Sequence, residues 1–287
     1  MIESSYTLTQ SMPVLEKKKR GRYVLKKADT TSRIILGVLL VFALLCFYFL
    51  FFLCEYQWDQ VRMDLVVSIV PQFFNYSAIT LKVAGNIFSS LCNTLLLAFL
   101  TTVIGAFLGL ILGLGAARNL SHPMLSNLIR GIAGIIRAVP TIIWTILFVS
   151  GFGLSATTAI VGMSFHSIAY FIKSYSESFE EVDANTIEAL RATGAKWGQI
   201  VISAVLPNSF TKMISWIAMR CEMNFAAAVI IGPAVGVPGT IGSILNQFSR
   251  GGNYGGMGLC ILVIFLSALL FELFLTRYKQ KTLVNVG

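Results

Sequence analysis

Residues 34 to 54 read IILGVLLVFALLCFYFLFFLC, a run of 21 residues without a charged side chain. At about 1.5 Å per residue, a helix of this length crosses the roughly 30 Å hydrocarbon core of a bilayer. A cleaved signal peptide is the competing interpretation, but its apolar run is usually only about 7 to 15 residues long. The largely polar segment of 33 residues ahead of the run also argues against cleavage. We therefore expect a transmembrane helix here.

Five further apolar stretches have nearly the length needed to cross a membrane. They lie near residues 91–117, 132–152, 156–175, 211–233 and 256–276. Charged residues make up 12% of the 287 residues, well below the ~25% usual in soluble domains. The two histidines and five cysteines show no paired spacing, which argues against a zinc cluster or a disulfide framework. The sequence predicts an all-α membrane protein with six transmembrane helices.

The distribution of lysine and arginine predicts the orientation, because cytoplasmic segments of membrane proteins collect basic residues. With the N-terminus inside, only Arg62, Lys82 and Arg250 fall in outside segments. We therefore expect both termini in the cytoplasm, and a basic N-terminal tail that is attracted to anionic lipid. The expected organisation is a basic cytoplasmic tail (1–33), a first transmembrane helix with an external loop (34–84), a helical core (85–276) and a cytoplasmic tail (277–287).

Three shorter patterns predict how the helices pack and connect. Gly105, Gly109 and Gly113 form a ridge of small residues that lets a second helix approach closely in lipid. The segment 232–242, GPAVGVPGTIG, disfavours a regular helix, and its apolar residues resist exposure to water. We expect it to fold back into protein at membrane depth. Residues 63–70 favour a short helix at the outer membrane interface.

The segment 176–210, SESFEEVDANTIEALRATGAKWGQIVISAVLPNSF, is the longest on the predicted cytoplasmic side. Its pattern predicts two short helices separated by Gly194, which permits the turn between them. Asn185 is expected to cap the first helix, with Glu188 three residues on, close to a capping box. The second helix must stop or bend near Pro207, which has no amide hydrogen. A helix-turn-helix should therefore protrude from the inner membrane face.

The spacing in this segment resembles the EAA loop of the membrane subunits of ABC importers. That pattern is EAA, three residues, G, nine residues, I, one residue and LP. Glu188, Ala189 and Gly194 match its first half, and Leu206 and Pro207 match its end. By this resemblance, these five residues couple the chain to an ATPase subunit. A helix pair that merely caps the bundle is the alternative.

The resemblance covers most of residues 85–276 and is closest to the phosphonate-transporter permease family. It includes the stretches RAVPTIIW (137–144), EALRATGA (188–195) and EMN (222–224), and the stretch around Lys173 and Glu177. The chain departs from the usual pattern at four places: Leu190 replaces an alanine, Ala204 replaces an isoleucine, VGVPGTIG replaces VGAGGIG from residue 235, and Ala226 replaces an arginine. The two departures within the loop stay apolar, so they still allow packing on a partner.

The resemblance implies a type I ABC importer permease-like fold and a set of partners. Two permease subunits, expected as a homodimer, would each seat an EAA loop in a cleft of a cytoplasmic ATP-binding subunit. An extracytoplasmic substrate-binding protein would deliver the solute, and ATP-driven closure of the ATPases would expose a central path alternately to each side. The implied substrate is a phosphonate or related oxyanion, and the implied location is the bacterial cytoplasmic membrane. Another small solute, such as an amino acid, is the nearest alternative.

Charged side chains inside transmembrane helices cost roughly 2.5 to 3.5 kcal/mol on insertion scales, so each needs a partner or water. Arg137, Arg220 and Glu222 lie in predicted spans, and together with Asn224 they are our candidates for the substrate path. An arginine facing such a path suits an anion, because its planar fork matches phosphate-like oxygens. Structural ion pairs or snorkelling to the headgroups are the alternative. His166 is a weaker candidate, since a lone intramembrane histidine more often packs through a hydrogen bond.

The sequence shows no catalytic or nucleotide-binding motif. Because GxxxxGK[ST] and HExxH are both absent, we expect ATP hydrolysis in a partner subunit, and we expect no metal, cofactor or nucleic acid on this chain. A stand-alone secondary transporter would need ion-coupling carboxylates in its spans, and only Glu222 and Glu272 qualify. The sequence therefore predicts a transport subunit and not an enzyme.

Overall fold

The computed structural model describes residues 15–17, 23–25, 30–53, 61–77 and 79–284. The chain forms two compact units, Met1–Met63 and Asp64–Gly287.

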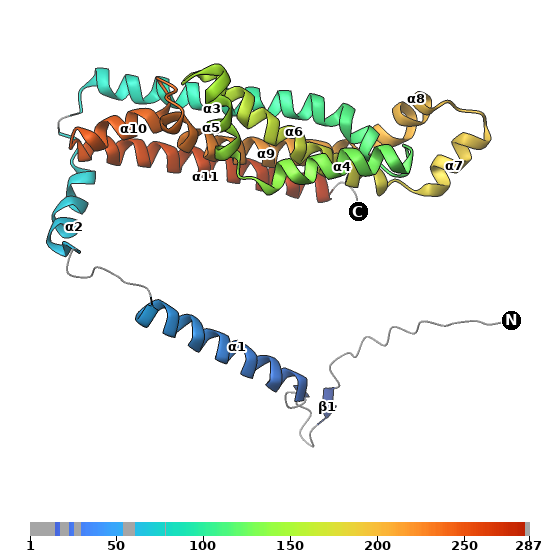
Figure 1. Cartoon of the computed structure of the whole chain (residues 1–287), viewed down its shortest axis with the longest axis horizontal. Coiled ribbons are helices and arrows are strands. Elements are labelled where there is room, and N and C mark those ends of the chain that lie inside the picture. Colours follow the sequence, from blue (N-terminus) through green and yellow to red (C-terminus); the bar gives the residue numbers. More distant parts are fainter. Residues whose placement is uncertain (1–14, 18–22, 26–29, 54–60, 78, 285–287) are drawn as a thin grey trace. The chain divides into compact units, whose positions relative to one another are not determined.

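The first unit contains a short hairpin and one long apolar helix (Figure 1). Strands β1 (Leu15–Lys17) and β2 (Tyr23–Leu25) pair antiparallel. Helix α1 (Thr30–Tyr48) continues through a π-helical turn, η1 (Phe49–Leu53), to give 24 helical residues. No side chain of α1 is buried, as expected for a helix surrounded by lipid. A helix is therefore present over the first predicted span, whereas Cys54 and most of the basic tail lie outside the described residues.

The second unit is a bundle of long helices. Its elements are α2 (Met63–Ile69), the 3₁₀ turn η3 (Val70–Phe74), α3 (Leu81–Ala116), α4 (Pro123–Ala138), α5 (Thr141–Phe152), α6 (Ala156–Glu180), α7 (Ala184–Ala192), α8 (Trp197–Ile200), the π-helical turn η4 (Val201–Val205), α9 (Leu206–Ala234), α10 (Ile241–Arg250) and α11 (Tyr254–Val284). Helices α3, α6, α9 and α11 run along the bundle, with α10 at one end and α7 and α8 at the other (Figure 1). The short helix expected at residues 63–70 is present as α2 and η3.

Four helical segments of the described chain are long and apolar enough to cross a membrane. They are Thr30–Leu53, Leu81–Ala116, Trp197–Ala234 and Tyr254–Phe274. The bent pair of α4 and α5 makes a fifth if it counts as one span. Helix α6 has 25 residues and is less apolar, because it carries serines and ionisable side chains. The predicted helical membrane-protein architecture is confirmed, with four or five apolar spans among the described residues.

The apolar stretch 132–152 forms two helices, so the prediction of a single helix there is wrong. Helices α4 and α5 meet at 93°. The break falls at Val139, whose ψ of 129° is extended, and at Pro140, which caps α5. Proline disfavours the helical conformation in the residue before it, which explains the position of the bend. The indole of Trp144 donates to the carbonyl oxygen of Ile136 at 2.8 Å and satisfies one of the last carbonyls of α4.

Helices α3 and α6 pack closely because glycines on α3 leave room for α6. A Cβ added at Gly105 would lie 2.6 Å from the Cβ of Ser167, and one added at Gly109 would overlap the Cβ of Phe171. Gly113 continues the contact one turn further along. The predicted glycine ridge is confirmed, and its partner is α6.

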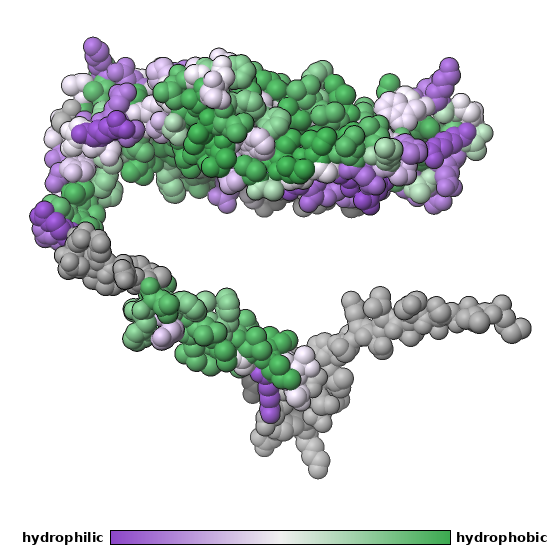
Figure 2. All heavy atoms as spheres, viewed as in Figure 1, coloured by the Kyte–Doolittle hydropathy of each residue, from purple (hydrophilic) through white to green (hydrophobic). Residues whose placement is uncertain are grey.

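The sides of the bundle are apolar, and polar side chains gather near its two ends (Figure 2). Large hydrophobic side chains along α3 and α11 are exposed, among them Phe88, Phe99, Phe107 and Phe265. A water-soluble monomer rarely exposes so much contiguous apolar surface. This distribution is that of a bundle whose sides contact lipid or another apolar chain.

The irregular segment between α9 and α10 is buried in protein, as predicted. Its two valines are buried against the bundle. The amide of Asn93 donates to the carbonyl oxygen of Gly239 at 3.0 Å, and the hydroxyl of Thr94 accepts from the backbone N–H of Ile241 at 2.9 Å. Side chains of α3 thus satisfy backbone groups that a regular helix would have satisfied internally.

Candidate functional site

Helix α7 is the first of the two short helices at the end of the bundle. It is capped by Asp183, whose carboxylate accepts from the backbone N–H of Asn185 at 3.1 Å. The prediction of Asn185 as the cap is therefore wrong, because the charged Asp183 stands two residues earlier and occupies the N-cap. The helix ends before Gly194, whose φ is +81°. No atom lies within 4 Å of a Cβ built at Gly194, so its conformation, and not lack of space, requires glycine here.

Helix α8 continues into α9 through the π-helical turn η4. The backbone N–H of Lys196 donates to Oε1 of Gln199 at 2.7 Å and closes the start of α8. The chain from Trp197 to Ala234 is one helical segment of 38 residues. Of the two outcomes predicted near Pro207, a stop or a bend, the stop is therefore wrong. A π-helical turn directly ahead of this proline alters the hydrogen-bond pattern where a regular α-helix would need its missing N–H.

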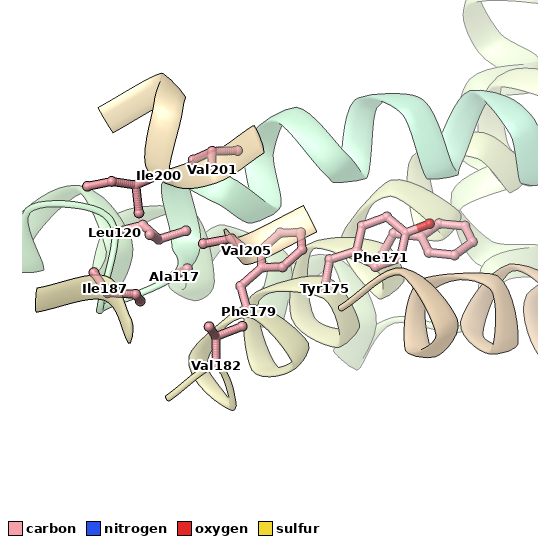
Figure 3. Packing of buried hydrophobic residues seen from close by; sticks show 10 residues of the cluster. All are labelled: Ala117, Leu120, Phe171, Tyr175, Phe179, Val182, Ile187, Ile200, Val201 and Val205. Carbon is pink, nitrogen blue, oxygen red and sulfur yellow. The ribbon is translucent and has the colours of Figure 1, made fainter. Parts of the chain in front are cut away.

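The α7–α8 pair docks on the end of the bundle through an apolar cluster (Figure 3). The buried members of this cluster are Ala117, Leu120, Phe171, Tyr175, Phe179, Val182, Ile187, Ile200, Val201 and Val205. They come from the loop after α3, from α6 and the turn that follows it, from α7 and α8, and from η4; partly buried side chains of α3 and α9 pack against them. Because apolar burial is the main favourable contribution to packing, this cluster joins the pair to α3, α6 and α9.

Two hydrogen bonds fix the helix pair to the loop that follows α3. A guanidinium nitrogen of Arg191 donates to the carbonyl oxygen of Asn119 at 3.0 Å. The indole of Trp197 donates to the carbonyl oxygen of Leu120 at 3.0 Å. Each short helix therefore has its own polar attachment to the same loop, in addition to the shared apolar cluster.

Three of the five residues predicted to couple to an ATPase lie on α7 and the turn after it, and the other two begin α9. Glu188, Ala189 and Gly194 are exposed. Leu206 is half-buried against the apolar cluster, and Pro207 is exposed. Of the two departures from the EAA pattern, Leu190 is half-buried against the same cluster and Ala204 is buried. Both therefore serve the packing of the loop on its own bundle.

Glu180, at the end of α6, is a polar junction that sequence reasoning missed. Its Oε1 accepts from Nη2 of Arg130 at 2.6 Å and from the backbone N–H of Arg118 at 2.7 Å. Nε of Arg130 in turn donates to the carbonyl oxygen of Ala116 at 2.8 Å. The junction ties α4 and the end of α3 to α6 directly beside the helix pair. Arg130 and Arg118 lie 50 and 62 residues from Glu180 in the sequence. No local sequence pattern could therefore predict these contacts.

A second polar cluster, the Arg220 network, joins α3, α6 and α9 inside the bundle. Nε of Arg220 donates to the hydroxyl of Ser167 at 3.1 Å, and Nη2 donates to Nδ1 of His166 at 2.9 Å. The guanidinium lies 5.0 Å from the ring centre of Tyr170, a cation–π geometry. Arg220 is 3% exposed, and no carboxylate of the described chain lies within ion-pair distance of it.

Asn224 extends this network to the third helix. Its amide nitrogen donates to the hydroxyls of Thr102 at 2.9 Å and Ser167 at 3.1 Å. Asn224 and Ser167 are fully buried, and the polar side-chain atoms of both have partners. The cost of burying these polar groups is thereby offset.

The predicted substrate-path residues do not all meet. Arg220 and Asn224 share the network together with His166, the weaker candidate. Glu222 is half-buried and Arg137 is exposed, and within the described ranges neither forms a hydrogen bond or ion pair. The sequence missed Ser167 and Tyr170 because serine and tyrosine carry no charge and are common in helices. Their spacing of one and four residues from His166 was the available signal.

Residues 109–284 match the protein family described as "Binding-protein-dependent transport system inner membrane component". The chain belongs to that family. Its members are the inner-membrane transport subunits of binding-protein-dependent systems, and the predicted resemblance to an ABC importer permease is confirmed.

Two curated relatives of this inner-membrane component carry the names of phosphorus oxyanions. The chain is 28% identical over 214 residues to "Phosphate-import permease protein PhnE" of Mycolicibacterium smegmatis, which covers 74% of the chain and 39% of the relative. It is 32% identical over 185 residues to "Phosphite transport system permease protein PtxC" of Stutzerimonas stutzeri, which covers 64% of the chain and 66% of the relative. The chain thus spans less than two thirds of either relative's length.

Solved structures of ABC transporters share the fold. The chain aligns with one chain of the inward-facing MetNI methionine ABC transporter at a TM-score of 0.62 and 22% identity, covering 69% of this chain and 97% of that one. It aligns with a chain of a bacterial ABC transporter that imports alginate at a TM-score of 0.58 and 15% identity, covering 88% and 99%. At these identities the likeness concerns the fold alone.

Proposed function

We propose that this chain is a membrane-spanning subunit of an ATP-driven ABC importer that moves a small phosphorus oxyanion, such as a phosphonate, phosphite or phosphate, by alternating access. The observation that carries this proposal is the α7–α8 pair, which is anchored to three long helices on one side and exposes Glu188, Ala189 and Gly194 on the other. Family membership and the names of the two oxyanion permeases support it.

The coupling step follows from the contacts of the helix pair. An ATP-binding subunit that seats the outer surface of α7 and α8 pushes on a compact body held by an apolar cluster and two hydrogen bonds. Because α8 continues into α9 as one helical segment, the displacement reaches Arg220 and Asn224 without crossing a loop. Glu180 carries the same displacement from the end of α6 to α4.

The proposal includes six spans with both termini in the cytoplasm of a bacterium. Helix α6 is the span that hydropathy alone does not identify, and α4 with α5 together form another. This arrangement puts α7 and α8 on the cytoplasmic side, as the lysine and arginine distribution predicts. A second copy of the chain completes the path, and a substrate-binding protein delivers the solute from outside.

The substrate path in this proposal passes Arg220 and Asn224, with Arg137 and Glu222 as further members. Arg220 is a buried cation with no carboxylate partner among the described residues, so an anion that reaches it gains both charge compensation and hydrogen bonds. The chain itself supplies no catalytic residue and no cofactor. ATP is hydrolysed in the partner subunit.

The deciding experiment is a mild-detergent pull-down of the chain from its native membrane, followed by mass spectrometry of the co-purifying proteins. Recovery of an ATP-binding subunit, reduced when Glu188 is changed to Arg, supports the proposal. Recovery of the chain alone, still competent for uptake into liposomes without ATP, would refute it in favour of a secondary transporter.

The turn between α7 and α8 gives a sharper test of coupling. Gly194→Val places a β-branched residue at φ +81° and should abolish ATP-driven uptake while leaving membrane insertion intact. Gly194→Asn, which tolerates this conformation, should keep most of the activity, and Gly198→Ala, which meets no atom within 4 Å, is the matched control. Normal uptake by the valine variant contradicts a coupling role for this turn.

An amino acid is the alternative substrate. The chain is 28% identical over 124 residues to "Methionine import system permease protein MetP" of Bacillus subtilis, which covers 41% of this chain and 53% of that protein. Uptake of labelled phosphite and uptake of labelled methionine by the same complex separate the two. Uptake of methionine without uptake of phosphite would exclude that oxyanion.

A further inference from the structure

Helix α6 carries a stripe of polar side chains along one side. The stripe, defined as His166, Tyr170, Lys173, Glu177 and Glu180, follows the alternating spacing of four and three residues that places side chains on one helical face. Over fourteen residues it extends about 21 Å along the helix. It starts at the buried Arg220 network and ends at the Glu180 junction next to the helix pair.

Midway along this stripe lies a basic pocket between α4 and α6. Its volume is about 170 Å³, enough for a small anion, and its lining residues are Arg130, Ala133, Gly134, Arg137, Ile172, Lys173, Ser176 and Glu177. Three of these residues are basic and one is acidic, so the pocket carries an excess of positive charge. A concave site with a few converging polar groups is the usual form of a small-ligand site.

The three cations of the basic pocket differ in how far they are already neutralised. Arg130 is held by Glu180 at 2.6 Å. Lys173 is 3.6 Å from Glu177, and both side chains of this pair are about half exposed. Arg137 has no hydrogen bond or ion pair with any residue that the structure describes. A tetrahedral oxyanion between Arg137 and Lys173 would compensate the free charge, because a guanidinium offers paired donors to such oxygens.

The basic pocket and the Arg220 network share one face of α6. Lys173, which lines the pocket, follows His166, the partner of Arg220, by seven residues, or about two helical turns. An anion that leaves Arg220 along this stripe therefore meets the cations of the pocket next. Beyond the pocket, the stripe ends beside α7 and α8.

We propose that the basic pocket is an exit subsite, in which Arg137 and Lys173 receive the transported phosphorus oxyanion from the Arg220 network and Glu177 promotes its release. This inference rests on the proposed function. In the present structure Glu177 pairs with Lys173, so an entering anion must displace this carboxylate and is repelled by it. Glu177 thereby keeps the subsite weak enough for the solute to leave.

The test measures inhibition of transport by solute on the exit side. The complete complex, with its ATPase subunits and binding protein, is reconstituted in phosphatidylcholine vesicles, and ATP-driven transport of methylphosphonate is followed while methylphosphonate on the ATPase side is raised. Arg137→Gln and Lys173→Gln should each raise the half-inhibiting concentration roughly tenfold, and Glu177→Gln should lower it roughly tenfold. In each variant the half-inhibiting concentration on the exit side should change by more than the KM on the entry side.

Two variants control for loss of charge and loss of fold. Arg277→Gln removes an exposed arginine on α11, away from the pocket, and should leave the half-inhibiting concentration unchanged. Arg137→Lys keeps the positive charge and should stay within a few-fold of the wild type. Retained ATP hydrolysis in each variant shows that the complex is assembled.

The outcomes separate this inference from the proposed function. If the wild type transports methylphosphonate but the three pocket variants share its half-inhibiting concentration, or if the wild type shows no exit-side inhibition, the exit subsite is wrong and the proposed function stands. If the wild type shows no ATP-dependent transport of any phosphorus oxyanion, both are wrong. If added phosphatidylglycerol alters transport by the wild type but not by Arg137→Gln, and exit-side inhibition is equal in both, the pocket holds a lipid headgroup and the proposal is overturned.

Discussion

Helix α6 presents two faces of opposite character to the rest of the bundle. Toward α3 it offers Ser167, Phe171 and Tyr175, and the α3 glycines leave no space between the two helices. On the other face, the polar stripe meets α9 and α4 through a hydrogen bond, a cation–π contact and an ion pair. The first face is close-packed, and an added Cβ at Gly105 or Gly109 would overlap it. The second is held by contacts that can be exchanged for contacts to an anion or to water.

The comparison indicates where motion during transport takes place. Close-packed helices behave as one body, because separating them forfeits many dispersion contacts at once. Polar contacts of partly exposed side chains are individually weak and can be replaced by contacts to water. We therefore expect α3 and α6 to move together, and the contact of α6 with α4, where the side chains of Arg130 and Glu180 are partly exposed, to rearrange.

The largest loss of stability is expected from a substitution in the close-packed contact between α3 and α6. Gly109→Ala brings a Cβ into overlap with Phe171, and overpacking of this kind costs about 1 to 3 kcal/mol. The thermal unfolding midpoint of the purified chain should fall clearly, with reduced yield from the membrane. The matched control, Gly131→Ala on α4, meets no atom within 4 Å and should raise stability by up to about 1 kcal/mol through helix propensity. Equal midpoints for the two variants would show that α3 and α6 are not closely packed.

An intermediate effect is expected at the end of the polar stripe. Glu180→Gln removes the charge that holds Arg130 and Arg118, at a cost of about 1 to 2 kcal/mol. ATP-driven uptake should fall several-fold more than thermal stability alone explains, because the link between α4 and α6 is weakened. Glu181→Gln is the control, since it removes only the exposed pair with Lys212, worth about 0.5 kcal/mol or less. If Glu180→Gln reduces uptake less than Glu181→Gln does, Glu180 does not link α4 to α6 during transport.

The smallest effect is expected at Tyr170. Tyr170→Phe keeps the ring beneath Arg220 and should leave uptake within about twofold of the wild type. Tyr170→Leu removes the cation–π contact, worth about 1 kcal/mol, and should reduce uptake about fivefold. Uptake kinetics over a range of solute concentrations measure both variants. A phenylalanine variant as impaired as the leucine variant would show that the hydroxyl, and not the ring, supports Arg220.

Local sequence patterns predicted the features that depend on backbone geometry. The ridge of glycines on α3 and the turn at Gly194 were both expected, since close approach and a positive φ each demand the residue that lacks a Cβ. The bend at Pro140 was missed although its signal was present, because an apolar run of spanning length outweighed a single proline. The cap at Asp183 was missed for a similar reason, as Asn185 stood in a nearly complete capping box.

Contacts between distant segments could not be read from the sequence. Glu180 meets Arg130 and Arg118 across 50 and 62 residues, and Asn224 meets Thr102 across 122 residues. Periodicity places each of these side chains on a face of its own helix but does not say which helix packs there. The charge of Arg220 predicted that it needed a partner. Only the packing of α6 against α9 identified His166 and Ser167 as its partners.

The buried turn between α9 and α10 also bears on how the chain is assembled during synthesis. Its backbone groups at Gly239 and Ile241 depend on Asn93 and Thr94, which lie on α3 and precede the turn by more than 140 residues. Unpaired backbone groups are unstable in hydrocarbon, so the turn becomes stable there only against a helix that is already in place. Because α3 is synthesised well before this turn, the side chains that the turn requires are already present when the turn is made.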